Sequence, residues 1–181
     1  MSGYAAFLRG INVGGHRIAS GELRERFVQL GFGEVSTFRA SGNVVFAATT
    51  REPLAGMAAR IEAGLAASLG YEVPVFLRTA PEVRAIAAYE PFPKPLIAAS
   101  QGKLQVAMLC ERPTGRMRKE VLALATDEDR LAFSDRELHW LPSGGILDSA
   151  LDFKVIGKLL GPMTTRTKGT VEQLAAKYFA R

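Results

Sequence analysis

The first half of the chain alternates apolar runs with polar, glycine-containing segments in a pattern that predicts seven elements. The continuous apolar run YAAFLR is typical of a strand buried on both faces. Apolar positions three and four residues apart predict helices, and the short connection RASG between two β-branched runs predicts a hairpin. In chain order, we expect a strand at 4–9, a helix at 20–31, strands at 34–38 and 43–47, a helix at 53–70, a strand at 73–78 and a short helix from Thr79.

Residues with capping chemistry mark several of the helix starts. Ser20 is a candidate N-cap, because its hydroxyl can accept a hydrogen bond from an unpaired backbone N–H of the first turn. Thr79 with Glu82, and Thr170 with Gln173, have the spacing of a capping box. We therefore expect helices to begin at these three positions.

The second half repeats much of this order but is predicted to end differently. Its apolar patterns give a strand, a helix, a hairpin and two final helices. The expected elements are a strand at 103–110, a helix from about Thr114 to Ala125, strands at 130–134 and 137–141, a helix at 147–161 and a last helix opening at Thr170. The order βαββαα resembles a copy of the first half that lacks its last strand.

Three prolines between Pro91 and Pro95 each remove a backbone donor and restrict the preceding residue, which predicts a boundary. We expect an N-terminal half at 1–90, a proline-rich connector at 91–102 and a C-terminal half at 103–181. The first six elements have the split βαβ arrangement. The predicted fold class is therefore α+β, with two ferredoxin-like halves, βαββαβα followed by a degenerate βαββαα, packed as one compact protein.

Composition narrows the class of protein. Apolar residues form 48% and charged residues 23% of the 181-residue chain, which is typical of globular proteins. No window of the sequence approaches the roughly 18 continuous apolar residues of a membrane span, so we expect a soluble, cytoplasmic protein with no membrane partner.

The single cysteine and the two histidines predict neither a reactive thiol nor a metal site. Cys110 is the only cysteine, and its place in an apolar strand predicts a buried, chemically inert thiol. With His16 and His139 it matches no metal-ligand spacing, so we expect no metal and no cofactor. Because His139 and Trp140 are neighbours along a strand, one is expected to face the core and the other outward.

A glycine-rich loop follows the first strand, in the stretch LRGINVGG. In the predicted topology this loop and the turn of the first hairpin share one edge of the sheet. Successive glycines leave backbone N–H groups free to point at an anion, and nearby arginines suit phosphate or carboxylate. The candidate ligand-binding residues at this edge are Arg9, Asn12, Gly14, Gly15, His16, Arg17, Arg39, Ser41 and Asn43.

The glycine spacing G-x-x-x-G-G matches neither the dinucleotide-binding fingerprint nor the P-loop, so it predicts no nucleotide specificity. Glycines that only permit a tight connection are the structural alternative. The leading hypothesis is a module that binds a phosphate-bearing small molecule or a nucleic-acid backbone. The alternatives are an enzyme acting on a phosphorylated or nucleotide-like ligand, with His16 as acid or base, and a structural or self-associating protein.

The net charge of +5 is concentrated near the C-terminus, where residues 153–181 hold six basic residues against Glu172 alone. Such an end can meet phosphates or an acidic partner. Lys158, Arg166 and Lys168 belong to this segment, and Arg166 joins the candidate ligand-binding residues. We expect no aromatic stacking pair beside either basic group, so phosphate contacts would supply most of any affinity for a polyanion.

The stretch LRGINVGG, followed by GELRERFVQLGFGEVSTFRASGNVVF, resembles the bacterial domain-of-unknown-function family 1697. The segments VFLRT, Pro91–Phe92 and TTRTKGTVEQL lie in the same order, so the resemblance extends over nearly the whole chain. It implies an α+β protein of two ferredoxin-like halves and brings no established activity, substrate or cofactor. The chain departs from the family pattern of an arginine followed by Asn-Trp-Asn-Thr, since Arg166 is followed here by Thr167, Lys168, Gly169 and Thr170.

Overall fold

The computed structural model describes residues 2–40, 42–49 and 52–180. The chain divides into two compact units, one formed by Met1–Val83 with Leu174–Arg181 and the other by Arg84–Gln173. It passes from one unit to the other within helices α3 (Ala80–Ala88) and α7 (Lys168–Tyr178).

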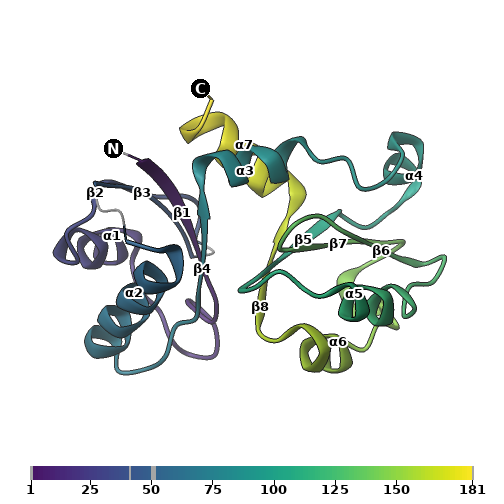
Figure 1. Cartoon of the computed structure of the whole chain (residues 1–181), viewed down its shortest axis with the longest axis horizontal. Coiled ribbons are helices and arrows are strands. Elements are labelled where there is room, and N and C mark those ends of the chain that lie inside the picture. Colours follow the sequence, from purple (N-terminus) through teal and green to yellow (C-terminus); the bar gives the residue numbers. More distant parts are fainter. Residues whose placement is uncertain (1, 41, 50–51, 181) are drawn as a thin grey trace. The chain divides into compact units, whose positions relative to one another are not determined.

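The first unit is built on an antiparallel sheet in the order β2-β3-β1-β4. Its strands are β1 (Ser2–Leu8), β2 (Gly33–Thr37), β3 (Asn43–Ala48) and β4 (Val75–Thr79). Helices α1 (Ser20–Gln29) and α2 (Leu54–Leu69) cover one face of this sheet (Figure 1). This is the ferredoxin-like arrangement, and the predicted βαββαβα order of the first half is confirmed.

Both faces of the central strand β1 are buried. Tyr4, Ala6 and Leu8 of β1 point into a core that includes Phe27 of α1 and Ile61 of α2. The alternate residues of the same strand are also shielded from solvent, as the continuous apolar run predicts. Each large apolar side chain removed from water contributes about 1.5–3 kcal/mol, so this sheet holds much of the unit's stability.

Two predicted helix boundaries of the first unit, the start at Thr79 and the end at Gly70, are confirmed. The predicted N-cap at Ser20 is wrong. The Thr79–Glu82 capping box forms, with the Thr79 backbone N–H donating to Glu82 at 2.7 Å and the Glu82 N–H donating to the Thr79 hydroxyl at 3.4 Å. Gly70 ends α2 in the left-handed conformation. Ser20, however, is already inside α1, because Ala19 occupies the N-cap position and no side chain caps this helix.

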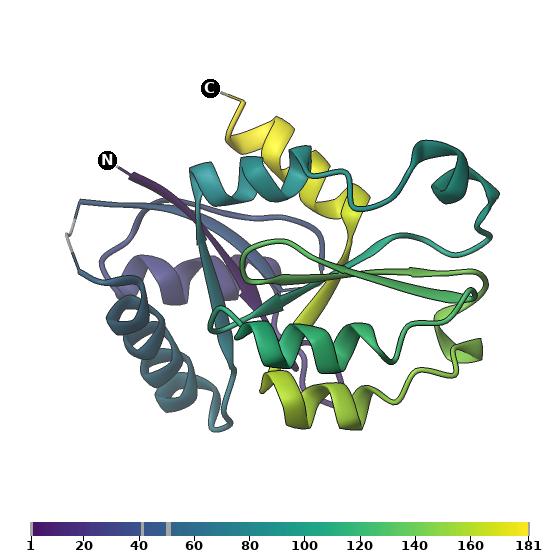
Figure 2. The same cartoon turned by 45° about the vertical axis from the view of Figure 1, so that its right-hand side comes forward.

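The second unit has the same strand order, β6-β7-β5-β8, again with every observed pairing antiparallel. Helices α5 and α6 lie side by side against one face of this sheet (Figure 2). A single 3₁₀ turn at Ile146–Asp148 precedes α6. The elements are β5 (Gln105–Leu109), α5 (Gly115–Leu122), β6 (Asp129–Phe133), β7 (Glu137–Pro142), α6 (Phe153–Leu160) and β8 (Met163–Thr167).

The two-halved α+β fold is confirmed, but the expectation that the second half lacks its last strand is wrong. Met163–Thr167 forms β8 and pairs with β5 along its whole length. The segment consists mostly of threonines with one arginine, so it has no apolar alternation to predict a strand, although β-branched threonine suits one. The last helix also begins earlier than Thr170, since Thr167 accepts the Thr170 N–H at 3.2 Å.

The core of the second unit contains Trp140, whose indole N–H donates to Asp129 at 2.7 Å. Ser149 donates to the same carboxylate oxygen, so this buried acid is well satisfied. His139 lies on the opposite face of the sheet and is also fully buried. The expectation that one of these two neighbours would face outward is therefore wrong, because both faces of β7 are covered.

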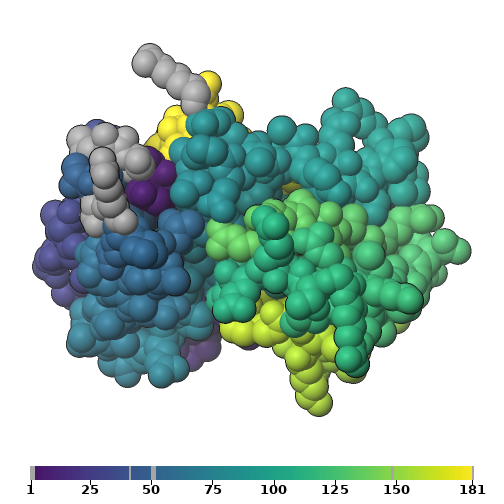
Figure 3. All heavy atoms as spheres, in the orientation of Figure 1, coloured from purple at the N-terminus to yellow at the C-terminus, as the bar shows by residue number. Residues whose placement is uncertain are grey.

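A short helix, α4 (Lys94–Ala99), lies within the proline-rich segment. Pro95 occupies its first turn, where a missing backbone N–H costs nothing. The helix lies at the surface, as Figure 3 shows, and none of its residues is buried. Among the described residues, no helix has the length and apolar character needed to span a membrane, and no group of three His, Cys, Asp or Glu side chains could hold a metal ion.

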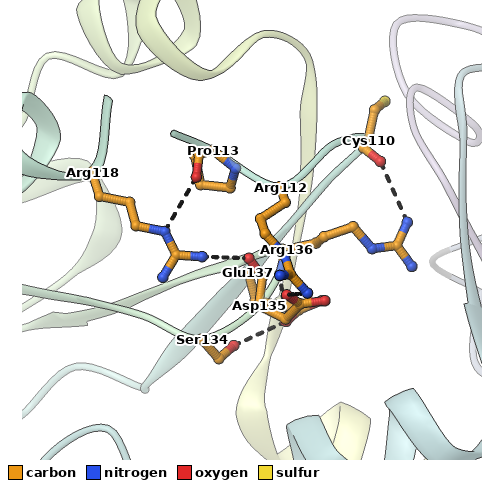
Figure 4. A network of polar contacts seen from close by, with 8 residues as sticks. All are labelled: Cys110, Arg112, Pro113, Arg118, Ser134, Asp135, Arg136 and Glu137. Atoms are coloured by element: carbon orange, nitrogen blue, oxygen red, sulfur yellow. Dashed lines mark hydrogen bonds and ion pairs between the residues drawn. The ribbon is translucent and has the colours of Figure 1, made fainter. Parts of the chain in front are cut away.

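Cys110 is exposed, which overturns the prediction of a buried thiol. The buried part of β5 ends at Leu109, one residue before the cysteine. Figure 4 shows the Cys110 side chain pointing away from a polar network at the β6–β7 turn, while its carbonyl accepts a hydrogen bond from Arg136 at 3.3 Å. The apolar stretch VAMLC is therefore one residue longer than the strand that it predicts.

We expect Cys110 to react with a neutral thiol reagent in the native protein, because its exposure leaves no unfolding step to wait for. The measurement is the rate of labelling with 4,4′-dithiodipyridine with and without denaturant. The two rates should agree to within about tenfold. Native-state labelling slowed by several orders of magnitude would contradict the exposed position.

Candidate functional site

The glycine loop, residues 10–17, leaves the sheet where β1 is held on both sides. The Leu8 N–H donates to the Gly42 carbonyl at 2.8 Å, and the Arg9 N–H donates to the Pro74 carbonyl at 3.0 Å. Ile11 and Ile18, at the two ends of the loop, are buried in the core of the first unit. The loop is therefore anchored at its base, whereas Val13, Gly14, Gly15 and His16 are exposed.

Asn12 holds the loop in shape through both ends of its amide. Its Oδ1 accepts the Ile18 N–H at 2.8 Å, which closes the loop on itself. Its Nδ2 donates to the Ala40 carbonyl at 3.0 Å, which ties the loop to the β2–β3 turn. Asn12 also has a φ of 58°, a conformation that asparagine tolerates better than most residues. This predicted ligand-binding residue thus positions the loop.

The loop apex presents backbone donors to solvent. Gly14 and Gly15 have φ angles of 61° and 90°, which turn the chain sharply and leave open space where side chains would be. The His16 N–H closes a turn onto the Val13 carbonyl at 3.1 Å. Across the part of the chain that the structure describes, the N–H groups of Gly14, Gly15 and Arg17 donate to no protein acceptor.

Two arginines, Arg9 and Arg17, flank the apex of the loop. Arg9 and Arg17 are exposed and, within the described residues, form no ion pair. Exposed Arg116, by contrast, is paired with Glu120 at 2.8 Å. The first acidic residue of the chain is Glu22, which is itself paired with Arg26 at 3.1 Å.

The β2–β3 turn contributes two further predicted residues. Arg39 is exposed, has a φ of 58°, and carries its guanidinium 5.6 Å from the centre of the Phe38 ring. Asn43 is buried and donates to the Phe38 carbonyl at 2.9 Å, so it stabilises the turn. Ser41, also predicted to bind ligand, lies outside the described residues.

The sequence does not predict the aromatic pair that lies beside the loop. The rings of His16 and Tyr71 stack with centroids 3.9 Å apart and planes 28° apart. Tyr71 packs against the core of the first unit, whereas His16 is exposed. The two residues are far apart in sequence and neither lies in a patterned element, so only the fold brings them together. The expectation that no stacking pair adjoins the basic groups is therefore wrong.

Arg166 belongs to β8 of the second unit and is 9% exposed. Its guanidinium donates to the Thr164 hydroxyl at 2.9 Å and to the Thr165 carbonyl at 2.8 Å. Burial lowers the pKa of Arg166 to about 10, because the charged form loses hydration. Its assignment to ligand binding stays a prediction. Lys168 is also buried, and its ammonium donates to the Ala87 and Tyr89 carbonyls at the C-terminal end of α3.

His139 on β7 and Arg166 on β8 face the same side of the second sheet, with β5 between them. Its Nε2 lies 2.9 Å from the Ser134 hydroxyl, which also donates to Glu137 at 2.9 Å. Its ring packs against that of Tyr89 at 4.8 Å. Burial, and secondarily the charge of Lys168, lower the pKa of His139 to about 4, so the ring is neutral at physiological pH.

The family model described as "Protein of unknown function (DUF1697)" matches residues 1–139, which include the glycine loop, the first hairpin and the Cys110 region and end within β7. The chain belongs to the DUF1697 family. No curated protein matches it. Among solved structures, that of the conserved bacterial protein SP0830 from Streptococcus pneumoniae is similar, with 20% identity, a TM-score of 0.70 and 97% of each chain covered. At that identity the likeness shows that the two proteins share a fold.

In this DUF1697 protein we expect Asn12→Ala to destabilise the first unit by about 1–3 kcal/mol, because two backbone groups lose their partners and alanine is strained at positive φ. Asn12→Asp keeps the acceptor for Ile18 and tolerates the same φ, so its loss should be smaller. Chemical denaturation of the three proteins measures the order. Equal stability of Asn12→Ala and wild type would contradict the role of the amide.

The stability of the DUF1697 protein should depend on His139 between about pH 6.5 and 4. The unfolded chain protonates this histidine near pH 6.5, whereas the folded protein keeps it neutral down to about pH 4. The contribution is therefore complete above pH 6.5 and is lost as the pH falls through this window, by up to about 3 kcal/mol.

Denaturation at several pH values tests this dependence. Titration of the carboxylates also changes stability in this range, but it does so equally in wild type and variants. His139→Gln and His139→Met should both flatten the profile relative to wild type. His16→Ala is the matched control, because it removes the chain's other histidine, which is exposed. A wild-type slope retained in both His139 variants would refute the assignment.

Proposed function

We propose that the glycine loop binds a phosphate-bearing anion. The observation that carries the proposal is the combination, at one loop apex, of unpartnered N–H groups at Gly14, Gly15 and Arg17 with two arginines that have no carboxylate partner among the described residues. Backbone N–H groups converging in a concave turn form a recognised type of anion site. Arginine adds charge and a planar set of donors that matches phosphate oxygens.

The helix that follows the loop supports the same polarity. Helix α1 begins at Ser20, and no side chain caps its first turn. Its N-terminal N–H groups therefore keep their partial positive charge, which favours a nearby anion. No acidic side chain precedes Glu22 in the sequence, so nothing in this stretch of chain competes for the arginines.

The proposal depends on Arg9 and Arg17 more than on the other predicted residues. Asn12 and Asn43 are engaged in holding the loop and the β2–β3 turn, so they act by positioning. Arg39 lies on the turn to which Asn12 ties the loop, and it would add charge at the same edge of the sheet. Arg166 lies in the second unit, and its part in ligand binding stays a separate prediction.

The test is titration of the full-length chain with inorganic pyrophosphate, followed by amide chemical shifts. We expect the largest shifts at Gly14, Gly15 and Arg17, and Arg17→Gln should weaken binding about tenfold, equivalent to about 1.4 kcal/mol, because one charge-assisted contact is lost. Arg116→Gln, which removes an exposed but paired arginine from the second unit, should leave the affinity unchanged. Shifts absent from the loop, or equal affinity in Arg17→Gln and wild type, would overturn the proposal.

A further inference from the structure

The stacked pair of His16 and Tyr71 places an aromatic surface directly beside the proposed anion site. His16 follows Gly15 and precedes Arg17, so its ring is attached within one residue of two of the unpartnered N–H groups. Neighbouring Cα atoms are about 3.8 Å apart, which puts ring and donors within the reach of one small ligand.

Tyr71 gives this surface a fixed orientation. Tyr71 packs against the core of the first unit and stacks on one face of His16 at 3.9 Å. His16 is itself exposed, and Tyr71 occupies one face of its ring, which leaves the other face for a ligand in the arrangement inferred below. An aromatic ring held in this way has already lost much of its rotamer freedom, which lowers the entropic cost of stacking a further ring on it.

We infer that the ligand of the glycine loop is a nucleotide unit, whose phosphate meets the loop N–H groups and arginines while its base stacks on His16. This inference rests on the proposed anion site and names the chemistry of its ligand. Stacking accepts every base, because each has a π-face, so the site distinguishes nucleotides from other phosphates more than one base from another. Free nucleotides and single-stranded nucleic acid both supply this chemistry.

A simpler role for the pair is to pin the loop against the core. Pinning requires only the face of His16 that touches Tyr71, whereas stacking of a base uses the outer face. The two roles predict different results for ligands that share a phosphate and differ in the base. A merely structural His16 would affect all phosphate ligands alike.

The experiment compares AMP, ribose 5-phosphate and adenosine as ligands of the full-length chain, with affinity measured by calorimetry or amide shifts. We expect wild type to bind AMP about tenfold more tightly than ribose 5-phosphate, which corresponds to one stacked base. His16→Ala should reduce AMP affinity to that of ribose 5-phosphate, with the latter unchanged to within about twofold. His16→Phe keeps a stacking ring without a titratable group and should retain the preference for AMP.

The outcomes separate this inference from the proposal beneath it. If AMP and ribose 5-phosphate bind equally to wild type, and oligonucleotides with and without bases also bind equally, the anion site stands and the nucleotide assignment is overturned. If His16→Ala weakens both ligands equally, His16 only pins the loop and the assignment is again overturned. If neither phosphate binds, the anion site itself fails.

A short oligodeoxyadenylate and an abasic oligonucleotide of the same length identify the source of the nucleotide. Suppose that AMP binds weakly but wild type prefers the strand with bases, and that His16→Ala loses this preference. This result supports the inference, with single-stranded nucleic acid as the source. A preference limited to AMP supports it with a free nucleotide as the source. Equal binding of both strands, combined with no preference for AMP, overturns it.

Discussion

The geometry of the candidate site depends on the antiparallel pairing of β1 with β3 and β4. Through this pairing the end of β1 lies between the start of β3 and the start of β4, and the hydrogen bonds of Leu8 and Arg9 to Gly42 and Pro74 hold it on both sides. The chain that leaves β1 must therefore rise from a fixed point at the sheet edge. Asn12 then joins the loop to the β2–β3 turn, so the loop apex inherits its position from the sheet.

Much of this arrangement follows from the sequence, because it depends on pattern and connectivity. A run of apolar residues as long as YAAFLR predicts a fully buried strand, and β1 is buried on both faces. Once the order βαββαβ is inferred, antiparallel alternation places the glycine loop and the first hairpin at the same edge without knowledge of any contact. The residues gathered at that edge could be predicted for the same reason, although their division into positioning and exposed groups could not.

Each wrong prediction from the sequence has a local physical cause. Strand β8 is an edge strand composed mainly of threonine, so its composition does not predict a strand. Its pairing with β5 stabilises the extended conformation. Cys110 continues an apolar run beyond the point where the strand ends, so periodicity alone misjudges its burial. The stacking of His16 on Tyr71 joins a loop to the segment before β4, and no periodic pattern describes a contact between two irregular segments.

The two halves of the chain share a fold but differ in chemistry at the corresponding edge. In the second unit Leu109 donates to the carbonyl of Arg136 at 2.9 Å, the counterpart of the bond from Leu8 to Gly42. There, however, Arg112 pairs with Asp135, and Arg118 donates to the Asp135 carbonyl at 2.7 Å (Figure 4).

The hydroxyl of Thr114 also caps the helix that follows this second edge, by accepting the Met117 N–H at 3.2 Å. Two arginines at this edge and one N–H of the helix's first turn therefore already have partners within the unit. At the edge of the first unit the helix has no side-chain cap, and Arg9 and Arg17 have no carboxylate partner among the described residues. The same topology thus carries the proposed anion site in the first half and an edge whose arginines have protein partners in the second. Ligand binding depends on which donors the local sequence leaves available and not on the fold that displays them.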